Sequence, residues 1–165
     1  MKDLYIDFDG VILNTIEEGY NNMRKLGLDP KNSSDCGKYF GTLDWDNFIS
    51  HTSQINNSID NIQRIIDSNR FNVFILTHIN SLDEAVAKVN YVRKYLKDIT
   101  IIPVPRKISK TQMVHSENAI LIDDYAGNLR EWKAAKGIGV RFSLKNNGKG
   151  FYAIDHLDEI LDLPI

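Results

Sequence analysis

Short apolar runs recur along this 165-residue chain, separated by longer amphipathic segments. The runs are continuous rather than alternating, which is typical of strands buried on both faces of a parallel sheet. We therefore expect parallel strands in these five segments: Leu4–Phe8, Val73–Leu76, Ile99–Val104, Ala119–Ile122 and Ile138–Phe142.

Segments with helical periodicity lie between the expected strands. Ser81 and Glu84 have the spacing of a capping box, and the apolar residues that follow at helical intervals predict a buried stripe. That stripe comprises Leu82, Ala85, Val86, Val89, Val92 and Leu96. The alternation of strand and helix predicts an α/β fold, a Rossmann-like parallel sheet flanked by helices.

Three further helices are expected. An apolar stripe runs from Ile59 to Ile66, directly before the second strand. Residues 127–136 form another helical pattern, with Gly137 at the C-cap position. The segment Ala153–Leu163 predicts a last helix near the C-terminus.

One interval interrupts this rhythm. From Asn14 to Asn57 the chain is polar, rich in Asn, Asp and Ser, and dotted with aromatic residues. This is longer than the usual connection within an α/β unit. We therefore predict a small, mostly helical cap at residues 14–70, inserted after the first strand. The α/β core then comprises residues 1–13 and 71–165.

Composition and charge narrow the function classes. The formal net charge is −2, which argues against a protein that grips a nucleic-acid polymer through a broad basic face. The one cysteine, Cys36, lies in a polar stretch without an obvious partner base, and it cannot form an internal disulfide. No apolar run reaches 18 residues. We expect a soluble cytoplasmic protein without a membrane partner.

Two acidic residues stand at the end of the first expected strand, in the string LYIDFDGV. Asp7 and Asp9 are two positions apart, so their side chains point to the same side of the chain. Ligands of open parallel sheets bind at the carboxyl ends of the strands. Two carboxylates that converge there repel each other, and Mg²⁺, which prefers oxygen ligands and often accompanies phosphate, would remove the conflict.

The other strand ends add a consistent set of side chains. The second strand ends at Thr77, the third leads into Arg106, Lys107 and Lys110, and the fourth ends at Asp123 and Asp124. Strand ends of a parallel sheet meet at one edge. A carboxylate pair, a hydroxyl, a lysine and a second carboxylate pair fit a metal-assisted site for phosphoryl transfer.

The order DFDGV, ILTH, lysine and LIDDYAGN resembles the four motifs of the haloacid dehalogenase-like hydrolase superfamily. These motifs span residues 4 to 128. The string IDDYAGNLREWKAAKGIGVRF also resembles the 5′(3′)-deoxyribonucleotidase branch and its bacterial relatives. The resemblance implies a Rossmann-like hydrolase that acts on a small phosphorylated substrate.

The resemblance assigns chemical roles to the first carboxylate pair. Asp7 would be the nucleophile that becomes an aspartyl-phosphate, and Asp9 would be the general acid and then the general base. Mg²⁺ would be held by the Asp7 carboxylate, the Asp9 backbone carbonyl and the acids of the fourth motif. Asp124 is the expected direct ligand, and Asp123 would act directly or through water. N-capping of the following helix is the alternative role of Asp123 and Asp124.

Phosphate binding falls to the second and third motifs. Thr77 would donate its hydroxyl, and His78 its backbone N–H, to a phosphate oxygen. Lys110, at the start of the segment KTQMV, would neutralise the phosphoryl oxygens, with Lys107 as the alternative lysine.

The cap would then determine the substrate. Relatives of the deoxyribonucleotidase branch stack the nucleobase on cap aromatics, and the same residue type is present here at Tyr20, Tyr39, Phe40, Trp45 and Phe48. The alternative is that these rings form the core of the cap. Three functions therefore stay open: a nucleotidase on nucleoside monophosphates, a phosphatase for a sugar phosphate or other small metabolite, and a non-catalytic binding module with the same fold.

Overall fold

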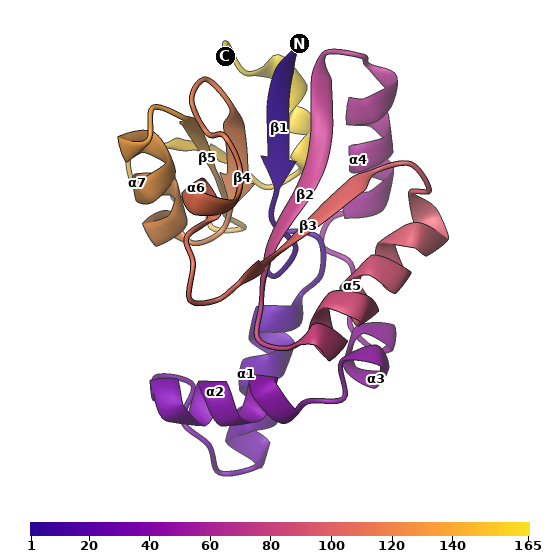
Figure 1. Cartoon of the computed structure of the whole chain (residues 1–165), viewed down its shortest axis with the longest axis vertical. Coiled ribbons are helices and arrows are strands. Elements are labelled where there is room, and N and C mark those ends of the chain that lie inside the picture. The colour runs from indigo at the N-terminus through magenta and orange to yellow at the C-terminus, as the bar shows by residue number, and fades with distance from the viewer.

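A single six-stranded parallel sheet forms the centre of the computed structural model, which describes residues 1–165 (Figure 1). Its strand order is β3-β2-β1-β4-β5-β6, and every neighbouring pair is parallel. The strands are β1 Lys2–Ile6, β2 Phe71–Ile79, β3 Thr100–Pro105, β4 Ile120–Asp123, β5 Ile138–Phe142 and β6 Tyr152–Ile154. The predicted α/β sheet is confirmed, and the short edge strand β6 was not predicted.

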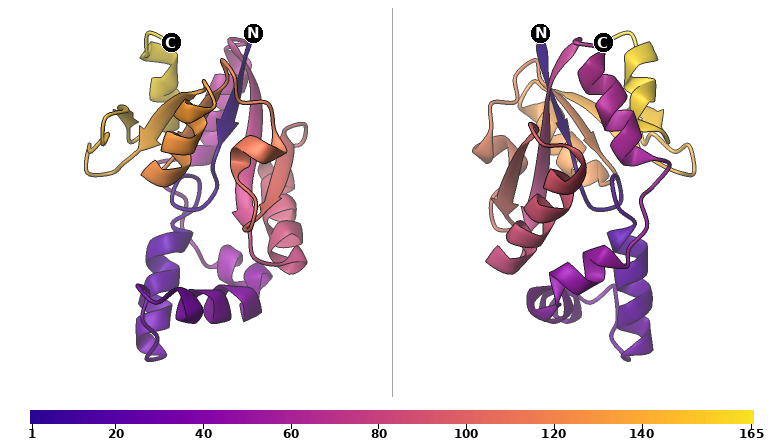
Figure 2. Two further views of the ribbon diagram at one scale, coloured as in Figure 1. Left: turned by 60° about the vertical axis from the view of Figure 1, so that its left-hand side comes forward. Right: turned by 90° about the vertical axis from the view of Figure 1, so that its right-hand side faces the viewer.

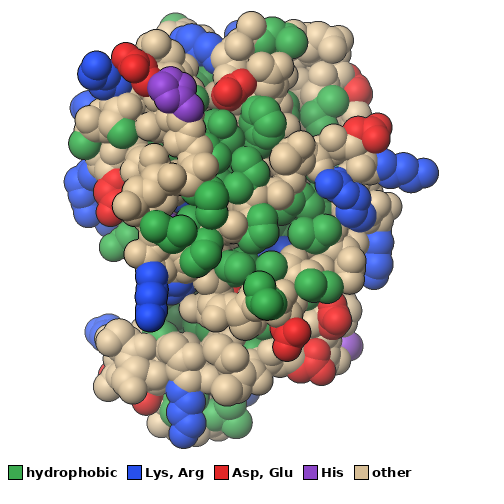
Figure 3. All heavy atoms as spheres, in the orientation of Figure 1, with side chains coloured by type: hydrophobic (Ala, Val, Ile, Leu, Met, Phe, Trp, Pro, Cys, Tyr) green, Lys and Arg blue, Asp and Glu red, His purple; other side chains and the backbone are tan.

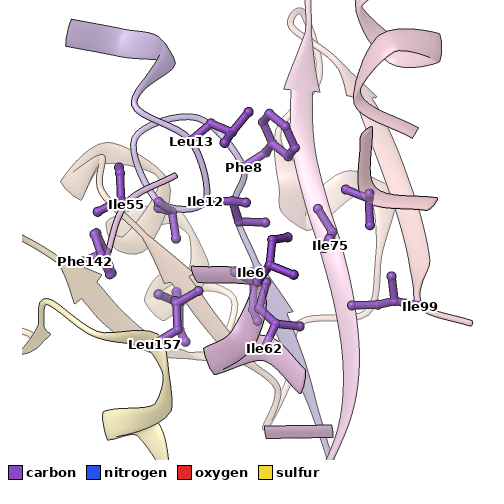
Figure 4. Packing of buried hydrophobic residues seen from close by; sticks show 14 of the residues in the cluster. Ile6, Phe8, Ile12, Leu13, Ile55, Ile62, Ile75, Ile99, Phe142 and Leu157 are labelled. Carbon is purple, nitrogen blue, oxygen red and sulfur yellow. The ribbon is translucent and has the colours of Figure 1, made fainter. Parts of the chain in front are cut away.

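The strands are buried on both faces, as the continuous apolar runs indicated. Along β1, Leu4 and Ile6 belong to one hydrophobic cluster, whereas Tyr5 belongs to the cluster on the other face. Figure 4 shows the first cluster, in which Ile6 and Ile75 of the sheet pack with Ile62. Because strand side chains alternate between faces, both faces need a covering layer of helices.

Two layers of helices supply that cover. On one face lie α4 (Ser58–Asp67), α5 (Leu82–Tyr95) and the 3₁₀ helix η1 (Leu157–Asp162). On the other face, α7 (Ala126–Ala134) packs against β4 and β5, next to the short helix α6 (Lys110–Met113). No helix of the chain is both long enough and apolar enough to cross a membrane.

The buried face of α5 differs from the predicted stripe. Leu82 and Val86 are exposed, with 80% and 55% of their surfaces accessible. Glu84, Ala87 and Lys88 are buried in their place, whereas Val92 and Leu96 of the predicted stripe are buried as expected. A Glu and a Lys four residues apart ordinarily form a solvent-exposed pair. They are buried here because the Asp9 side chain contacts the Lys88 ammonium.

Three helices make up the part of the molecule that lies beyond the carboxyl ends of the strands, on the side opposite both termini (Figure 2). These cap helices are α1 (Thr15–Lys25), α2 (Ser33–Thr42) and α3 (Trp45–Ser50). The surface is hollowed between them and the sheet-containing part (Figure 3). Helix α4, which falls within the expected cap at residues 14–70, packs instead against β2 and η1. We therefore propose a narrower cap that ends before α4.

Two predictions for the C-terminal half of the chain were wrong: the helix at Ala153–Leu163 and the C-cap role of Gly137. The segment Ala153–Leu163 forms the end of β6 and then η1, because Tyr152–Ile154 extends the sheet beside β5 before the chain turns. At the end of α7 the residue with left-handed backbone is Lys136, at φ 63°, rather than Gly137. Gly137 has a packing role, because a Cβ at this position would lie 2.3 Å from the ring of Trp132 and 2.8 Å from the Ser116 carbonyl oxygen.

This close approach predicts opposite effects of two glycine substitutions. Gly137→Ala should lower the free energy of unfolding by about 1–3 kcal/mol, because the added methyl overlaps a buried ring and a backbone oxygen. Gly37→Ala in α2 should raise it by about 0.5–1 kcal/mol, because open space surrounds that position and alanine favours a helix. Urea unfolding of both variants and wild type measures the difference. Equal effects of the two substitutions would contradict the packing role of Gly137.

Candidate active site

A cavity of about 620 Å³ lies between the carboxyl ends of the strands and the cap helix α1. The carboxylates of Asp7, Asp9 and Asp124 line it from the core side. Ile16 and Tyr20 line it from α1. Asp9 and Asp124, which are 115 positions apart in sequence, therefore line one cavity, as predicted for strand ends of a parallel sheet.

The backbone fixes Asp7 beside the fourth strand. The Asp7 N–H donates to the carbonyl oxygen of Ile122 at 2.9 Å, which continues the pairing of β1 with β4. The chain then turns at Gly10, whose φ of +72° favours glycine. A Cβ on Gly10 would lie 2.4 Å from Asp124 Oδ2, so only glycine lets this turn approach the carboxylate.

A buried lysine joins the two carboxylate pairs. Lys110 Nζ lies 2.8 Å from Asp7 Oδ1 and 2.7 Å from Asp123 Oδ2. Burial alone would lower the pKa of Lys110, but the carboxylates of Asp123 and Asp7 more than offset it and raise the pKa. Lys110 is thus protonated between two acids. It is the first residue of α6, as expected for a helix that starts with the segment KTQMV. Lys107, the alternative lysine, is exposed at the cavity wall.

Two carboxyl groups of the cavity resist ionisation. Burial raises the pKa of Asp7 to about 7, and Asp123 and Asp9 add to the effect while Lys110 opposes it. Burial likewise raises the pKa of Asp124 to about 8, with further contributions from Asp7, Asp123 and Asp9. The physical cause is crowding: too many negative charges share a space with little water.

Asp7, Asp123 and Asp124 form a cluster with the donor set of a hard divalent cation. One oxygen from each carboxylate lies within 4.8 Å of the others. None of the hydrogen bonds of the structure ends on the Asp124 carboxylate, whereas Asp123 accepts from Lys110, the Tyr125 N–H and Asn128 Nδ2. The residues therefore fit Mg²⁺, because a divalent ion would relieve the crowding that raises both pKa values.

The two residues expected to bind phosphate differ in position. Thr77 is fully buried beneath the cavity, and its Oγ1 accepts a hydrogen bond from Lys88 at 3.0 Å. His78 lines the cavity, and its Nε2 donates to the Ile108 carbonyl oxygen at 2.9 Å. Burial lowers the pKa of His78, the Ile108 hydrogen bond opposes this shift, and the positive charges of Lys110 and Arg106 lower it further. The ring is thus neutral at pH 7.

Sequence reasoning missed Lys88, which holds the second carboxylate of the first motif. Its ammonium lies on the fully buried face of α5, 2.6 Å from Asp9 Oδ2 and 2.9 Å from Glu84 Oε1. The other Asp9 oxygen, Oδ1, accepts from Thr15 Oγ1 at 2.7 Å. The available signal was a second set at helical spacing, Glu84, Ala87 and Lys88, which lies outside the predicted stripe.

The cap aromatics divide into two groups. Tyr39, Trp45 and Phe48 are buried, and Phe40 stacks on Trp45 with ring centroids 6.0 Å apart. Only Tyr20 lines the cavity. Of the two alternatives for these rings, the structure supports the cap core for four of them and leaves only Tyr20 in a position to contact a ligand in the cavity.

Comparison with known proteins gives structural matches only. No protein-family model matches the chain, and no curated protein matches it. Among solved structures, a hydrolase from Pseudomonas syringae superposes with a TM-score of 0.62 at 10% identity, covering 98% of this chain and 97% of the other. A HAD-superfamily hydrolase of subfamily IA from Geobacter sulfurreducens superposes with a TM-score of 0.62 at 14% identity, covering 98% of both chains.

A third similar structure contains ligands. The D,D-heptose 1,7-bisphosphate phosphatase of B. bronchiseptica, in complex with magnesium and phosphate, superposes with a TM-score of 0.59 at 12% identity. The alignment covers 98% of this chain and 97% of that one. These likenesses do not single out the nucleotidase branch. They confirm that the chain has the fold of the haloacid dehalogenase-like hydrolases, which its four motifs predicted.

Proposed function

We propose that this protein is a Mg²⁺-dependent phosphomonoesterase that acts through an aspartyl-phosphate on Asp7. The observation that carries the proposal is the shared cavity, in which Asp7, Asp9 and Asp124 face the same space and Lys110 lies behind them. The fold of known hydrolases and phosphatases supports the same chemistry. A binding module would not require a proton-transferring acid next to a nucleophile.

In the first step Asp7 Oδ2 attacks phosphorus, because Oδ1 is engaged by Lys110. The bond between phosphorus and the ester oxygen breaks, and Asp9 gives its proton to the leaving oxygen. In the second step a water attacks the same phosphorus, Asp9 takes the proton of that water, and the bond to Asp7 breaks. Inorganic phosphate leaves and both carboxyl groups return to their starting states.

Lys110 and the proposed metal would neutralise the negative charge of the transferred phosphoryl group. Mg²⁺ bound by the carboxylates of Asp7, Asp123 and Asp124 and by the Asp9 carbonyl would supply positive charge at the transferred phosphoryl group. Lys110 holds Asp7 and Asp123 in fixed positions and adds a protonated donor. The Thr77 hydroxyl and the His78 N–H are the proposed donors to phosphate oxygens.

The residues that line the cavity favour a small metabolite, rather than a nucleotide, as the substrate. One aromatic residue of the cap, Tyr20, faces the cavity, whereas Arg106 and Lys107 lie on its wall. Neither cation forms an ion pair within the chain. We infer that the substrate carries a second acidic group, a carboxylate or another phosphate, which these two side chains meet. A nucleoside monophosphate stays the alternative.

Removal of the nucleophile tests the reaction. Asp7→Asn should lower phosphate release from every hydrolysed phosphomonoester by at least about a thousandfold, because asparagine cannot form the aspartyl-phosphate. Asp162→Asn, on the exposed surface, is the matched control and should keep wild-type activity. Circular dichroism checks that both variants fold. Wild-type turnover by Asp7→Asn would refute the assigned nucleophile.

The raised pKa values predict how pH and metal affect stability. Asp7 and Asp124 hold protons in the folded state up to about pH 7 and 8, whereas the ordinary value is 3.8, so unfolding releases protons in this window. The metal-free protein should therefore lose stability as pH rises from about 4 to 8. Mg²⁺ should raise the melting temperature more at pH 8 than at pH 5, and chelation should reverse this gain.

The control for this effect removes one of the two carboxylates. Asp124→Asn should flatten the pH dependence of the metal-free protein and reduce the Mg²⁺-induced rise in melting temperature. Differential scanning calorimetry at both pH values, with chelator and with Mg²⁺, provides the comparison. An equal metal effect at both pH values would contradict a site built on crowded carboxylates.

The proposed second acidic group is tested with paired phosphomonoesters. Arg106→Gln should lower kcat/KM about tenfold, or ~1.4 kcal/mol, for 4-carboxyphenyl phosphate and leave that for phenyl phosphate nearly unchanged. Arg130→Gln, which is exposed on α7 and does not line the cavity, should leave both values unchanged. An equal loss on both substrates would mean that Arg106 attracts only the transferred phosphate.

A further inference from the structure

A single ammonium group connects three parts of the candidate site. Lys88 Nζ contacts Asp9 Oδ2 at 2.6 Å, Thr77 Oγ1 at 3.0 Å and the His78 carbonyl oxygen at 3.1 Å. It also lies 5.3 Å from the ring centroid of Trp45 in the cap helix α3. No part of the Lys88 side chain is exposed to solvent.

We propose that Lys88 is a positioning residue that orients Asp9 for proton transfer and Thr77 for phosphate binding. The inference rests on the proposed phosphomonoesterase function and adds a residue that no motif of the chain includes. Lys88 acts through the two side chains it contacts and does not reach the cavity itself.

The contacts of Asp9 explain how its orientation is set. Lys88 engages Oδ2 from the core helix α5, and the Thr15 hydroxyl engages Oδ1 from the first residue of α1. A carboxylate has about four lone-pair sites, so these two contacts leave others free. The Asp9 side chain is 13% exposed and lines the cavity, so the free sites face the substrate. One contact to each oxygen, from two different helices, restricts rotation of the carboxyl group.

The contact with Thr77 has a separate consequence. Lys88 can only donate hydrogen bonds, so Thr77 Oγ1 accepts at 3.0 Å. The hydroxyl proton of Thr77 is then directed away from the ammonium. Its present acceptor, the His78 carbonyl oxygen, is distant at 3.3 Å. Because Thr77 lies buried beneath the cavity, its proposed role requires that this proton turn from the His78 carbonyl oxygen to a phosphate oxygen bound at the cavity floor.

Burial of Lys88 fits a role that depends on fixed geometry. Removing an ammonium from water is unfavourable by several kcal/mol or more unless partners surround it. The carboxyl oxygens of Asp9 and Glu84 lie 2.6 and 2.9 Å away, and the centre of the Phe8 ring lies 5.2 Å away. A flexible surface lysine would hold Asp9 only loosely, because its four-carbon chain has many rotamers. The packed helix α5 removes that freedom.

The decisive readout is dependence on the leaving group. p-Nitrophenolate leaves without a proton, whereas an alkoxide needs one from Asp9. Lys88→Met should therefore lower the ratio of kcat/KM for glycerol phosphate to that for p-nitrophenyl phosphate by about 100-fold. Asp9→Asn should lower the same ratio to a similar extent. Adding Lys88→Met to Asp9→Asn should not change this ratio further, because both substitutions impair the same proton transfer from Asp9.

Glu84→Gln is the matched control. It removes the second ion pair of Lys88 within the same buried cluster but keeps the contact with Asp9. It should lower the free energy of unfolding and keep the wild-type ratio. If Lys88→Met does not fold because the buried Glu84 is left without an opposite charge, the double variant Lys88→Met with Glu84→Gln removes both charges and takes its place in the comparison.

A crystal structure of the Lys88→Met variant gives a result that does not depend on turnover. The Asp9 carboxylate should leave its wild-type orientation or occupy more than one. A proportional loss on both substrates, or an Asp9 that keeps its orientation without Lys88, would overturn the inference while the phosphomonoesterase function stands. Absence of any turnover by wild type, across alkyl and aryl esters, would overturn the proposed function and the positioning role of Lys88 with it.

Discussion

The crowding of carboxylates at one edge of the sheet is the constraint on which the site depends. Five acids gather around the ends of β1, β2 and β4, and two buried ammonium groups, Lys88 and Lys110, lie among them. The acids are Asp7, Asp9, Glu84, Asp123 and Asp124. If all five acids were ionised, two positive charges would not balance them in this buried space, and for this reason Asp7 and Asp124 keep their protons up to about pH 7 and 8. The proposed affinity of the site for a divalent metal follows from this imbalance, because a bound cation would allow these carboxyl groups to ionise.

Much of the fold and of the site follows from local patterns. Continuous apolar runs fix the parallel sheet, and a carboxylate directly after a buried strand must emerge at its carboxyl end. Asp7 and Asp124 could therefore be placed together although they are 117 residues apart. Lys110 could be placed because it opens a helix immediately before β4. Each of these residues is tied to a regular element whose direction the sequence specifies.

The remainder depends on contacts between distant segments, which periodicity does not describe. Glu84 and Lys88 have the spacing of a surface pair, and only the approach of Asp9 to α5 makes their burial favourable. The cap aromatics show the same limitation. Whether a ring such as Trp45 stacks on a ligand or fills a small core depends on how three short helices pack. The structure shows the second arrangement, with Tyr20 as the exception at the cavity.

Chemical trapping of the intermediate tests the central claim most directly. The wild-type protein would be mixed with Mg²⁺ and a phosphomonoester that it hydrolyses, quenched with acid, treated with borohydride and analysed by peptide mass spectrometry. Borohydride converts an aspartyl-phosphate to homoserine, so the account predicts homoserine at position 7 and at no other aspartate. Homoserine at a different position, or its absence from position 7 under conditions of steady turnover, would contradict a covalent reaction at Asp7.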